Sequence, residues 1–198
     1  MRTKKGNKEK DILEASIRVF ASHGYYQAKI SEIARAAGVA TGSVYLYYKN
    51  KKTLLYKVFE HLWKELENES RLIAGRHDIN PIEKLDSIID LFFDKLISNP
   101  DLAKVYAKEL TFILQDNNAS VIRPYDKFSD FATQVFQEGV KKGLIHPHLN
   151  VTVLRHFLLG GLRAVIHEWA NHPPDVSLNT LRDNVKSVIK HGVVQNPV

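Results

Sequence analysis

The sequence predicts an all-α protein, and two observations support that prediction. Apolar residues recur at helical spacing along most of the 198-residue chain, and no alternating strand pattern of useful length interrupts them. Helix-start signals such as Asn80-Pro81 and Asn99-Pro100 separate the periodic stretches. The chain contains no cysteine, which excludes disulfides, thiolate metal sites and thiol nucleophiles. We therefore expect about nine helices.

A first helix is expected over residues 8–22, and residues 30–48 predict two short helices joined by a tight turn. The apolar face of the first short helix has the 0, 3, 4 and 7 spacing of a helix and is formed by Ile30, Ile33, Ala34 and Ala37. Gly38 supplies a left-handed stop, and a second apolar pattern then runs through Val44 to Tyr48. This is a helix-turn-helix unit, whose second helix can enter the DNA major groove.

The outward face of that second helix predicts contact with DNA bases. With Val44 and Tyr48 turned inward, Gly42, Ser43 and Leu46 point outward at about 100° per residue. A face that is small or apolar can approach base edges closely, and hydroxyl groups at its border can reach phosphates. We therefore expect base readout from residues 41–43.

The next helix is expected to begin after Asn50, which is a good N-cap, with Lys51 and Lys52 in its first turn. Cations in a first turn oppose the helix dipole, so their presence indicates another role, and phosphate contact is the natural one. The expected DNA-binding residues are Lys29, Thr41, Gly42, Ser43, Tyr45, Tyr47 and Lys51.

Positive charge is concentrated in the same part of the chain. Residues 1–57 hold 12 Lys and Arg against 4 Asp and Glu, a net charge of +8, whereas the remainder holds 16 against 18, a net charge of −2. A segment that binds DNA phosphates is expected to carry such a local excess of positive charge. An N-terminal arm near the DNA would be formed by Lys4, Lys5, Lys8 and Lys10. A solvated tail is the alternative interpretation of its first residues.

The remainder of the chain predicts six more helices. The long helix after Asn50 ends at a polar break over residues 75–78, and Asn80-Pro81-Ile82-Glu83 then has the N-cap, N1 proline and N3 glutamate of a helix start. Pro173-Pro174 forces a late loop. The apolar stripes of the other five helices run from Ile82 to Leu96, Leu102 to Ile113, Tyr125 to Phe136, Leu154 to Trp169 and Leu178 to Ile189.

Residues 8–59 resemble the DNA-binding domain of TetR-family transcriptional regulators. The matching residues are Ile12, Ala15, Phe20, Gly24-Tyr25, Ile33-Ala34, Ala37-Gly38-Val39, Gly42, Val44-Tyr45, Tyr47-Tyr48, Lys51 and Leu54-Leu55. Lys29 stands where the family often has a capping Thr, and Ala40-Thr41 where it often has Ser-Lys, so the operator sequence does not carry over. The resemblance implies a DNA-binding domain over residues 1–52 and a ligand-binding and dimerisation domain over residues 53–198.

The resemblance also implies a homodimer whose last two helices form a four-helix interface. Gly160-Gly161 would permit close approach of helices, although packing within one chain is the alternative. The expected interface residues are Gly160, Gly161, Leu181, Val185 and Val188. Such a dimer would bind a palindromic operator in double-stranded DNA, with half-sites about 34 Å apart.

Regulators of this type resemble switches, in which a small hydrophobic effector binds in the helical core and controls DNA binding. The alternative is a C-terminal domain that serves only for dimerisation. The expected ligand-binding residues are Phe92, Tyr106, Glu109, Phe128, Arg163 and His167. A charged group in a helical core must be paired or neutralised, so such positions often mark sites. An ion pair between Glu109 and Arg163 is the alternative explanation for both residues.

Within the family, the stretch GSVYLYYKNKKTLLYKVFEHLW is similar to repressors of fatty-acid degradation genes that respond to long-chain acyl-CoA. This similarity implies a tunnel for the acyl chain, with Arg163 or Lys108 near the CoA phosphates. Multidrug-efflux repressors share the same DNA-binding domain, so a drug effector is the alternative. With either effector we expect a repressor that the effector releases from its operator, and the alternative is an effector that promotes DNA binding.

Motifs of other functional classes are missing from the sequence. It has no His-Glu-x-x-His, phosphate-binding glycine loop or Gly-x-Ser-x-Gly, so we expect no enzyme. His146-Pro147-His148 has no third ligand nearby, so we expect neither a metal nor a cofactor there. A helical adaptor that binds only protein would not explain the basic N-terminal segment. With no secretory signal and no long apolar run, a cytoplasmic protein that makes no membrane contact is expected.

Overall fold

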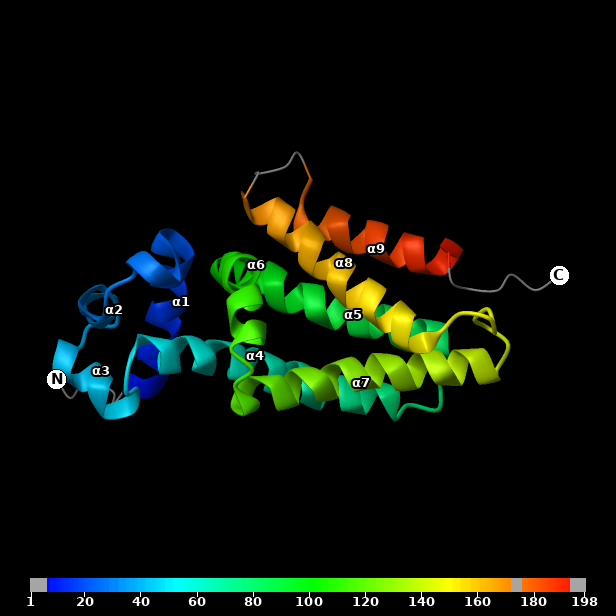
Figure 1. Cartoon of the computed structure of the whole chain (residues 1–198), viewed down its shortest axis with the longest axis horizontal. Coiled ribbons are helices and arrows are strands. Elements are labelled where there is room, and N and C mark those ends of the chain that lie inside the picture. The colour runs from blue at the N-terminus through cyan, green and yellow to red at the C-terminus, as the bar shows by residue number, and fades with distance from the viewer. Residues whose placement is uncertain (1–6, 172–175, 193–198) are drawn as a thin grey trace.

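A computed structural model describes residues 7–171 and 176–192, and it confirms the all-α prediction within them (Figure 1). No strand occurs in these two ranges, and the loop predicted at Pro173-Pro174 lies outside the described residues. The nine helices of the described residues are α1 (Lys8–Gln27), α2 (Ile30–Ala36), α3 (Thr41–Tyr47), α4 (Lys51–Ala74), α5 (Pro81–Ser98), α6 (Pro100–Gln115), α7 (Ala119–Lys141), α8 (Val151–Asn171) and α9 (Leu178–Gly192).

The helices form two parts that α4 connects (Figure 1). We call the cluster of α1, α2 and α3 the head, and the larger group of α5 to α9 the body. Helix α4 begins at the head and runs along α7 in the body, while α8 and α9 lie on the opposite side (Figure 1). Helix α6 lies at the end of the body that faces the head, where it packs against α1.

A continuous apolar core runs from the head into the body through α4. Fully buried side chains of the head and of the first turns of α4 are Ile12, Phe20, Ile33, Val44, Leu54 and Leu55. Deeper in the body, the ring of Trp63 in α4 lies against Tyr125 and Phe128 of α7, with centroid distances of 4.9 and 5.7 Å. The body is therefore filled by aromatic side chains where the sequence predicted a ligand.

Asparagine caps fix where several helices begin, as the sequence predicted. The side-chain oxygen of Asn50 accepts a hydrogen bond from the N–H of Thr53 at 2.8 Å. Asn80 and Glu83 form the predicted capping box, in which each side chain accepts a hydrogen bond from the other residue's N–H, at 3.1 and 2.8 Å.

Helix α1 continues past its predicted end at Ser22 to Gln27, but its geometry breaks at Gly24, where φ is 72° and ψ is 163°. Only glycine adopts such a φ at little cost. The apolar spacing of the first helix could not reveal this extension, because it follows a break in the helix.

Candidate DNA-binding and effector sites

The turn between α2 and α3 has the geometry that the sequence predicted. Gly38 has a φ of 68°, and its N–H donates to the carbonyl oxygen of Arg35 at 3.2 Å. The N–H of Val39 donates to the carbonyl oxygen of Ala34 at 3.0 Å, which closes the end of α2. The two helices are thereby held as a helix-turn-helix unit at the surface of the head.

Helix α3 turns its predicted face to solvent. Val44 and Tyr48 are buried, whereas Leu46, Tyr45 and Tyr47 are 82%, 54% and 44% exposed. The Tyr48 hydroxyl donates to the carbonyl oxygen of Glu9 at 3.2 Å, and burial raises its pKa to about 12, so it stays a donor at neutral pH. This bond anchors the end of α3 on α1.

The small residues of the predicted reading face are accessible to different degrees. Thr41 and Gly42 are exposed and Ser43 is half-buried at the start of α3. Lys29, just before α2, is exposed as well. Of the predicted basic arm, Lys8 and Lys10 are exposed on α1, while Lys4 and Lys5 lie outside the described residues.

Lys51, for which the sequence predicts phosphate contact, has internal partners in the structure. Its ammonium group donates to the carbonyl oxygens of Tyr26 and Ala28, each at 2.9 Å, and lies 4.7 Å from the ring centroid of Tyr25. Lys52 pairs with Asp116 of α6 at 2.6 Å. These partners explain two cations in the first turn of α4, where the helix dipole disfavours them.

A cavity of about 240 Å³ lies between α6, α7 and α8. Helix α6 contributes Tyr106, Leu110 and Leu114 to its wall, and Arg163 enters from α8. The remaining lining residues are Tyr125, Asp126, Ser129, Arg155, His156, Leu159 and Gly160. The wall is thus apolar on the α6 side and carries two guanidinium groups on the α8 side.

The polar groups of the cavity favour a ligand with an anionic group. Burial raises the pKa of Tyr106 and of Tyr125, and nearby Arg163 opposes this effect in both, so both phenols remain neutral donors. Arg155 pairs with Asp130 at 3.3 Å through one terminal nitrogen, but its buried Nε has no hydrogen-bond partner among the described residues. An anion could accept hydrogen bonds from these groups.

The structure brings only some of the predicted ligand residues together. Tyr106 and Arg163 line the cavity, whereas Phe92 and Phe128 belong to the aromatic core and do not line it. The ring centroid of Phe92 lies 5.4 Å from that of Tyr106 and 6.4 Å from that of Phe128. His167 does not line the cavity. Its Nδ1 instead lies 2.9 Å from the carbonyl oxygen of Ala107 in α6.

The hydrogen-bond partner of Glu109 is a backbone N–H and not Arg163, with which the sequence analysis considered an ion pair. Its buried carboxylate accepts a hydrogen bond from the N–H of Tyr25, at 2.8 Å.

Sequence reasoning also missed Arg155 and Tyr125 of the cavity wall. Arg155 stands eight positions before Arg163, which places the two side chains about 80° apart around α8, close enough to border one cavity, and this signal could have identified it.

A second hollow, of about 260 Å³, lies between α8 and α9 and has an apolar wall. The predicted interface residues Gly161, Leu181, Val185 and Val188 line it, together with Phe157. Phe157 and Val188 are 73% and 63% exposed. A Cβ atom added at Gly160 or Gly161 would meet nothing within 4 Å, so packing within the described chain does not require glycine at either position.

No helix within the described ranges is long and apolar enough to cross a bilayer.

Two family models together match most of the chain. The model described as "Bacterial regulatory proteins, tetR family" matches residues 12–58, and the model described as "YsiA-like protein, C-terminal region" matches residues 59–192. The first match contains the whole helix-turn-helix unit, and the second contains both hollows of the body.

Individual relatives point to the same family. The chain is 28% identical over 186 residues to the fatty acid metabolism regulator protein of Bacillus subtilis, covering 92% of this chain and 93% of that protein. The structure of the fatty acid degradation regulator FadR from Bacillus halodurans is similar with a TM-score of 0.84 and 28% identity, covering 96% of this chain and 98% of that one. FadR from Bacillus subtilis in complex with stearoyl-CoA has a TM-score of 0.78 and 25% identity, covering 92% and 98%.

The internal role of Lys51 predicts a loss of stability when its ammonium group is removed. Lys51→Met keeps the apolar stem but leaves two carbonyl oxygens of the α1 end without their donor, so the free energy of unfolding should fall by about 1–2 kcal/mol. Urea unfolding measures this free energy, and Lys29→Met, a substitution at an exposed position, is the control. Equal stability of Lys51→Met and the wild type would contradict the assignment.

Proposed function

Because this chain belongs to the TetR family of transcriptional regulators, we propose that it is a homodimeric repressor that long-chain acyl-CoA releases from its operator. The observation that supports this effector best is the cavity between α6, α7 and α8, where apolar side chains of α6 face the guanidinium groups of Arg155 and Arg163. An acyl thioester of CoA has matching parts, an apolar chain and a phosphate-bearing head. A repressor of this kind works in the cytoplasm, where its operator lies.

The related FadR from Bacillus subtilis is known in complex with stearoyl-CoA, which supports the same ligand class for this chain. A cavity of about 240 Å³ has room for about eight water-sized groups, so a long acyl chain must also displace core side chains. Trp63 borders that core, and its buried indole N–H has no partner among the described residues. We propose that the acyl chain enters beside Trp63 while the CoA phosphates lie near Arg163.

A multidrug-efflux repressor is the alternative that the sequence left open. Cationic drugs need acidic or aromatic partners. The cavity wall offers the rings of Tyr106 and Tyr125, but among the residues that line it Asp126 is the single carboxylate against two arginines, which repel a cation. Burial is the main cause that raises the pKa of this carboxyl group, which further weakens it as a cation site. The wall therefore favours an anionic effector over a cationic drug.

We assign operator contact to the exposed face of α3 and its surroundings. Base readout comes from Thr41, Gly42 and Ser43, and phosphate contact from Lys29, Tyr45 and Tyr47, all of which are exposed except the half-buried Ser43. Lys51 instead stabilises the head from within, through the end of α1.

The dimer is supported by the apolar hollow between α8 and α9. Exposed Phe157 and Val188 flank it, and the open space beside Gly161 would admit a helix of a second copy, whereas Gly160 lines the cavity between α6, α7 and α8. On soluble proteins, a contiguous exposed apolar surface of this kind usually marks an interaction site.

The operator assignment predicts two different responses to substitution. Lys29→Met should weaken binding to all DNA sequences alike and lower the salt slope of binding by about one unit. Ser43→Ala should instead change the preference at one or two base pairs, since each base contact contributes about 1–3 kcal/mol. Fluorescence anisotropy with DNA from the protein's own promoter and with single-base variants measures both.

An equal loss across every DNA sequence for Ser43→Ala would overturn the base-readout assignment. Binding of the wild type that did not depend on salt would favour the protein-binding adaptor considered from the sequence.

The effector assignment predicts that stearoyl-CoA lowers the operator affinity of the wild type by about tenfold or more. Arg163→Met should raise the stearoyl-CoA concentration needed for this release by about tenfold, because a charge-assisted hydrogen bond is lost. Lys108→Met removes an exposed cation of α6 that does not line the cavity, and it should behave as the wild type. Operator affinity that stearoyl-CoA leaves unchanged would exclude this effector.

The dimer assignment predicts that Phe157→Asp yields monomers at micromolar concentration, because it places a carboxylate inside the apolar interface. Sedimentation velocity measures the molar mass. Leu72→Asp is the matched control, since Leu72 is 70% exposed on α4 and lies outside the hollow. A wild type that is monomeric, or a Phe157→Asp variant that remains dimeric, would refute the proposed interface.

A further inference from the structure

The head is held to the body at a joint formed by the end of α1, the start of α4 and the last turns of α6. The ring of Tyr25 stacks on Phe112 of α6, with centroids 5.4 Å apart. Lys51 lies over the same tyrosine ring, and Lys52 is paired with Asp116. Aromatic packing and cations therefore join all three helices in one small region.

The most buried polar contact of this joint is made by Glu109. Its side chain is in α6 and the residue is only 6% exposed. Within the part of the chain that the structure describes, no Lys or Arg forms a salt bridge with this carboxylate, and it accepts a hydrogen bond from the N–H of Tyr25 at 2.8 Å. A buried carboxylate without a cation is costly, so packing alone would favour an apolar residue here.

The break at Gly24 makes this hydrogen bond available. Because the backbone leaves helical geometry at Gly24, the N–H of the next residue points to α6 instead of continuing the bonds of α1. An added Cβ at Gly24 would lie 3.8 Å from the same Glu109 oxygen. Glu109 thus contacts α1 at the one place where the helix changes direction.

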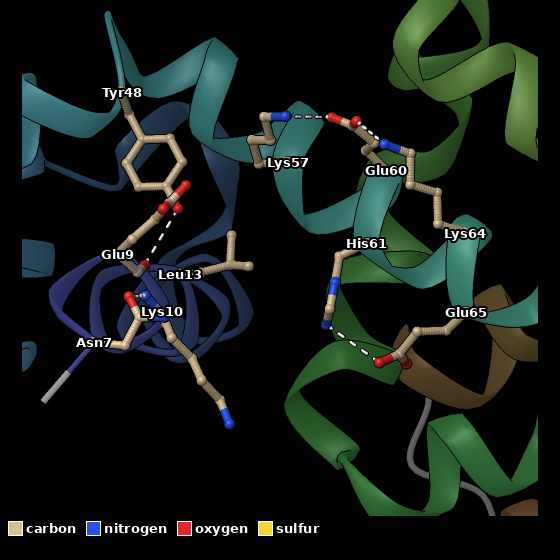
Figure 2. Close-up of a pocket in the computed structure, with 10 residues that line it drawn as sticks. All are labelled: Asn7, Glu9, Lys10, Leu13, Tyr48, Lys57, Glu60, His61, Lys64 and Glu65. Carbon is tan, nitrogen blue, oxygen red and sulfur yellow. Dashed lines mark hydrogen bonds and ion pairs between the residues drawn. The ribbon is translucent and has the colours of Figure 1, made fainter.

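Away from the joint, a cleft separates the head from α4 (Figure 2). It measures about 500 Å³, and its walls include Lys10 and Leu13 of α1 and His61 of α4. In Figure 2 the α4 side chains that line it bond to one another, with Lys57 and Lys64 on Glu60. A turn of the head about the joint would widen or narrow this cleft.

Helix α6 also carries the wall of the effector cavity. Tyr106, Leu110 and Leu114 recur every four residues and line the cavity, while Glu109, Phe112 and Asp116 of the same helix contact the other elements of the joint. Helix α6 is continuous over Pro100–Gln115, so a ligand that displaces its cavity face would also displace the carboxylate of Glu109. A displacement of about 1 Å takes an N–H···O contact out of hydrogen-bond range.

We propose that Glu109 is the positioning residue that couples the cavity to the DNA-binding head, through its hydrogen bond to the N–H of Tyr25. With the cavity empty, the bond fixes the orientation of the head. With the cavity filled, the bond is broken and the head turns away from its DNA-competent orientation. This inference rests on the proposed repressor function.

The first test measures the bond itself, by amide hydrogen exchange at Tyr25 without DNA. Glu109→Leu should make this amide exchange about tenfold faster or more, because its acceptor is gone. Glu109→Gln keeps an oxygen at the same place and should exchange nearly as the wild type does. Glu60→Gln changes another buried carboxylate, which forms ion pairs with Lys57 and Lys64 of its own helix, and should leave Tyr25 unaffected.

The second test measures coupling, as the ratio of operator affinities without and with stearoyl-CoA. In Glu109→Leu this ratio should fall close to one while stearoyl-CoA still binds, and Glu109→Gln should restore it. A residue with only a structural role would lower stability and leave the ratio unchanged. A wild-type ratio in Glu109→Leu, or unchanged exchange at Tyr25, overturns the proposal.

A third variant separates this proposal from the choice of effector. Leu159→Trp fills the cavity from α8 and takes the place of a ligand. If stearoyl-CoA has no effect on the wild type but Leu159→Trp speeds exchange at Tyr25, the effector assignment fails and the coupling stands. If Leu159→Trp leaves Tyr25 unchanged, the coupling fails, whatever stearoyl-CoA does.

Discussion

The end of α1 is the structural constraint on which the position of the DNA-binding head depends. Its carbonyl oxygens at Tyr26 and Ala28 are bonded by Lys51 of α4, and the N–H of Tyr25 is bonded by Glu109 of α6. One helix end is therefore satisfied by two other helices, each of which reaches into the body. Because α2 and α3 pack on α1, these few hydrogen bonds set where the reading face of α3 points.

The cavity between α6, α7 and α8, to which we assign the effector, shares α6 with the joint, and this provides a short physical route from the cavity to the head. The centre of the body is packed and not open, because the rings of Trp63, Tyr106 and Phe128 occupy it. Two buried groups have no hydrogen-bond partner among the described residues: the Nε of Arg155, a residue of the cavity wall, and the indole N–H of Trp63, whose ring packs against Tyr106 and Tyr125 of that wall. Such groups lower the cost of opening the site to a ligand with polar atoms.

The features that depend on local spacing could be predicted from the sequence. The buried Val44 and Tyr48, the glycine turn before α3 and the caps at Asn50 and Asn80 follow from helix periodicity and capping rules. The roles of Lys51, Glu109 and His167 could not be predicted, because their partners stand 25, 84 and 60 positions away. Periodicity places a side chain on a helix face but does not identify the element opposite.

The distance between the two heads of the dimer, with and without stearoyl-CoA, tests the account most directly. The chain has no cysteine, so Ser22→Cys on α1 carries one spin label per subunit for pulsed electron paramagnetic resonance. The account predicts one narrow distance distribution for the free dimer that operator DNA leaves in place, and a shift of several ångströms or a clear broadening when stearoyl-CoA binds. A distribution that stayed the same while stearoyl-CoA weakened operator binding would contradict it.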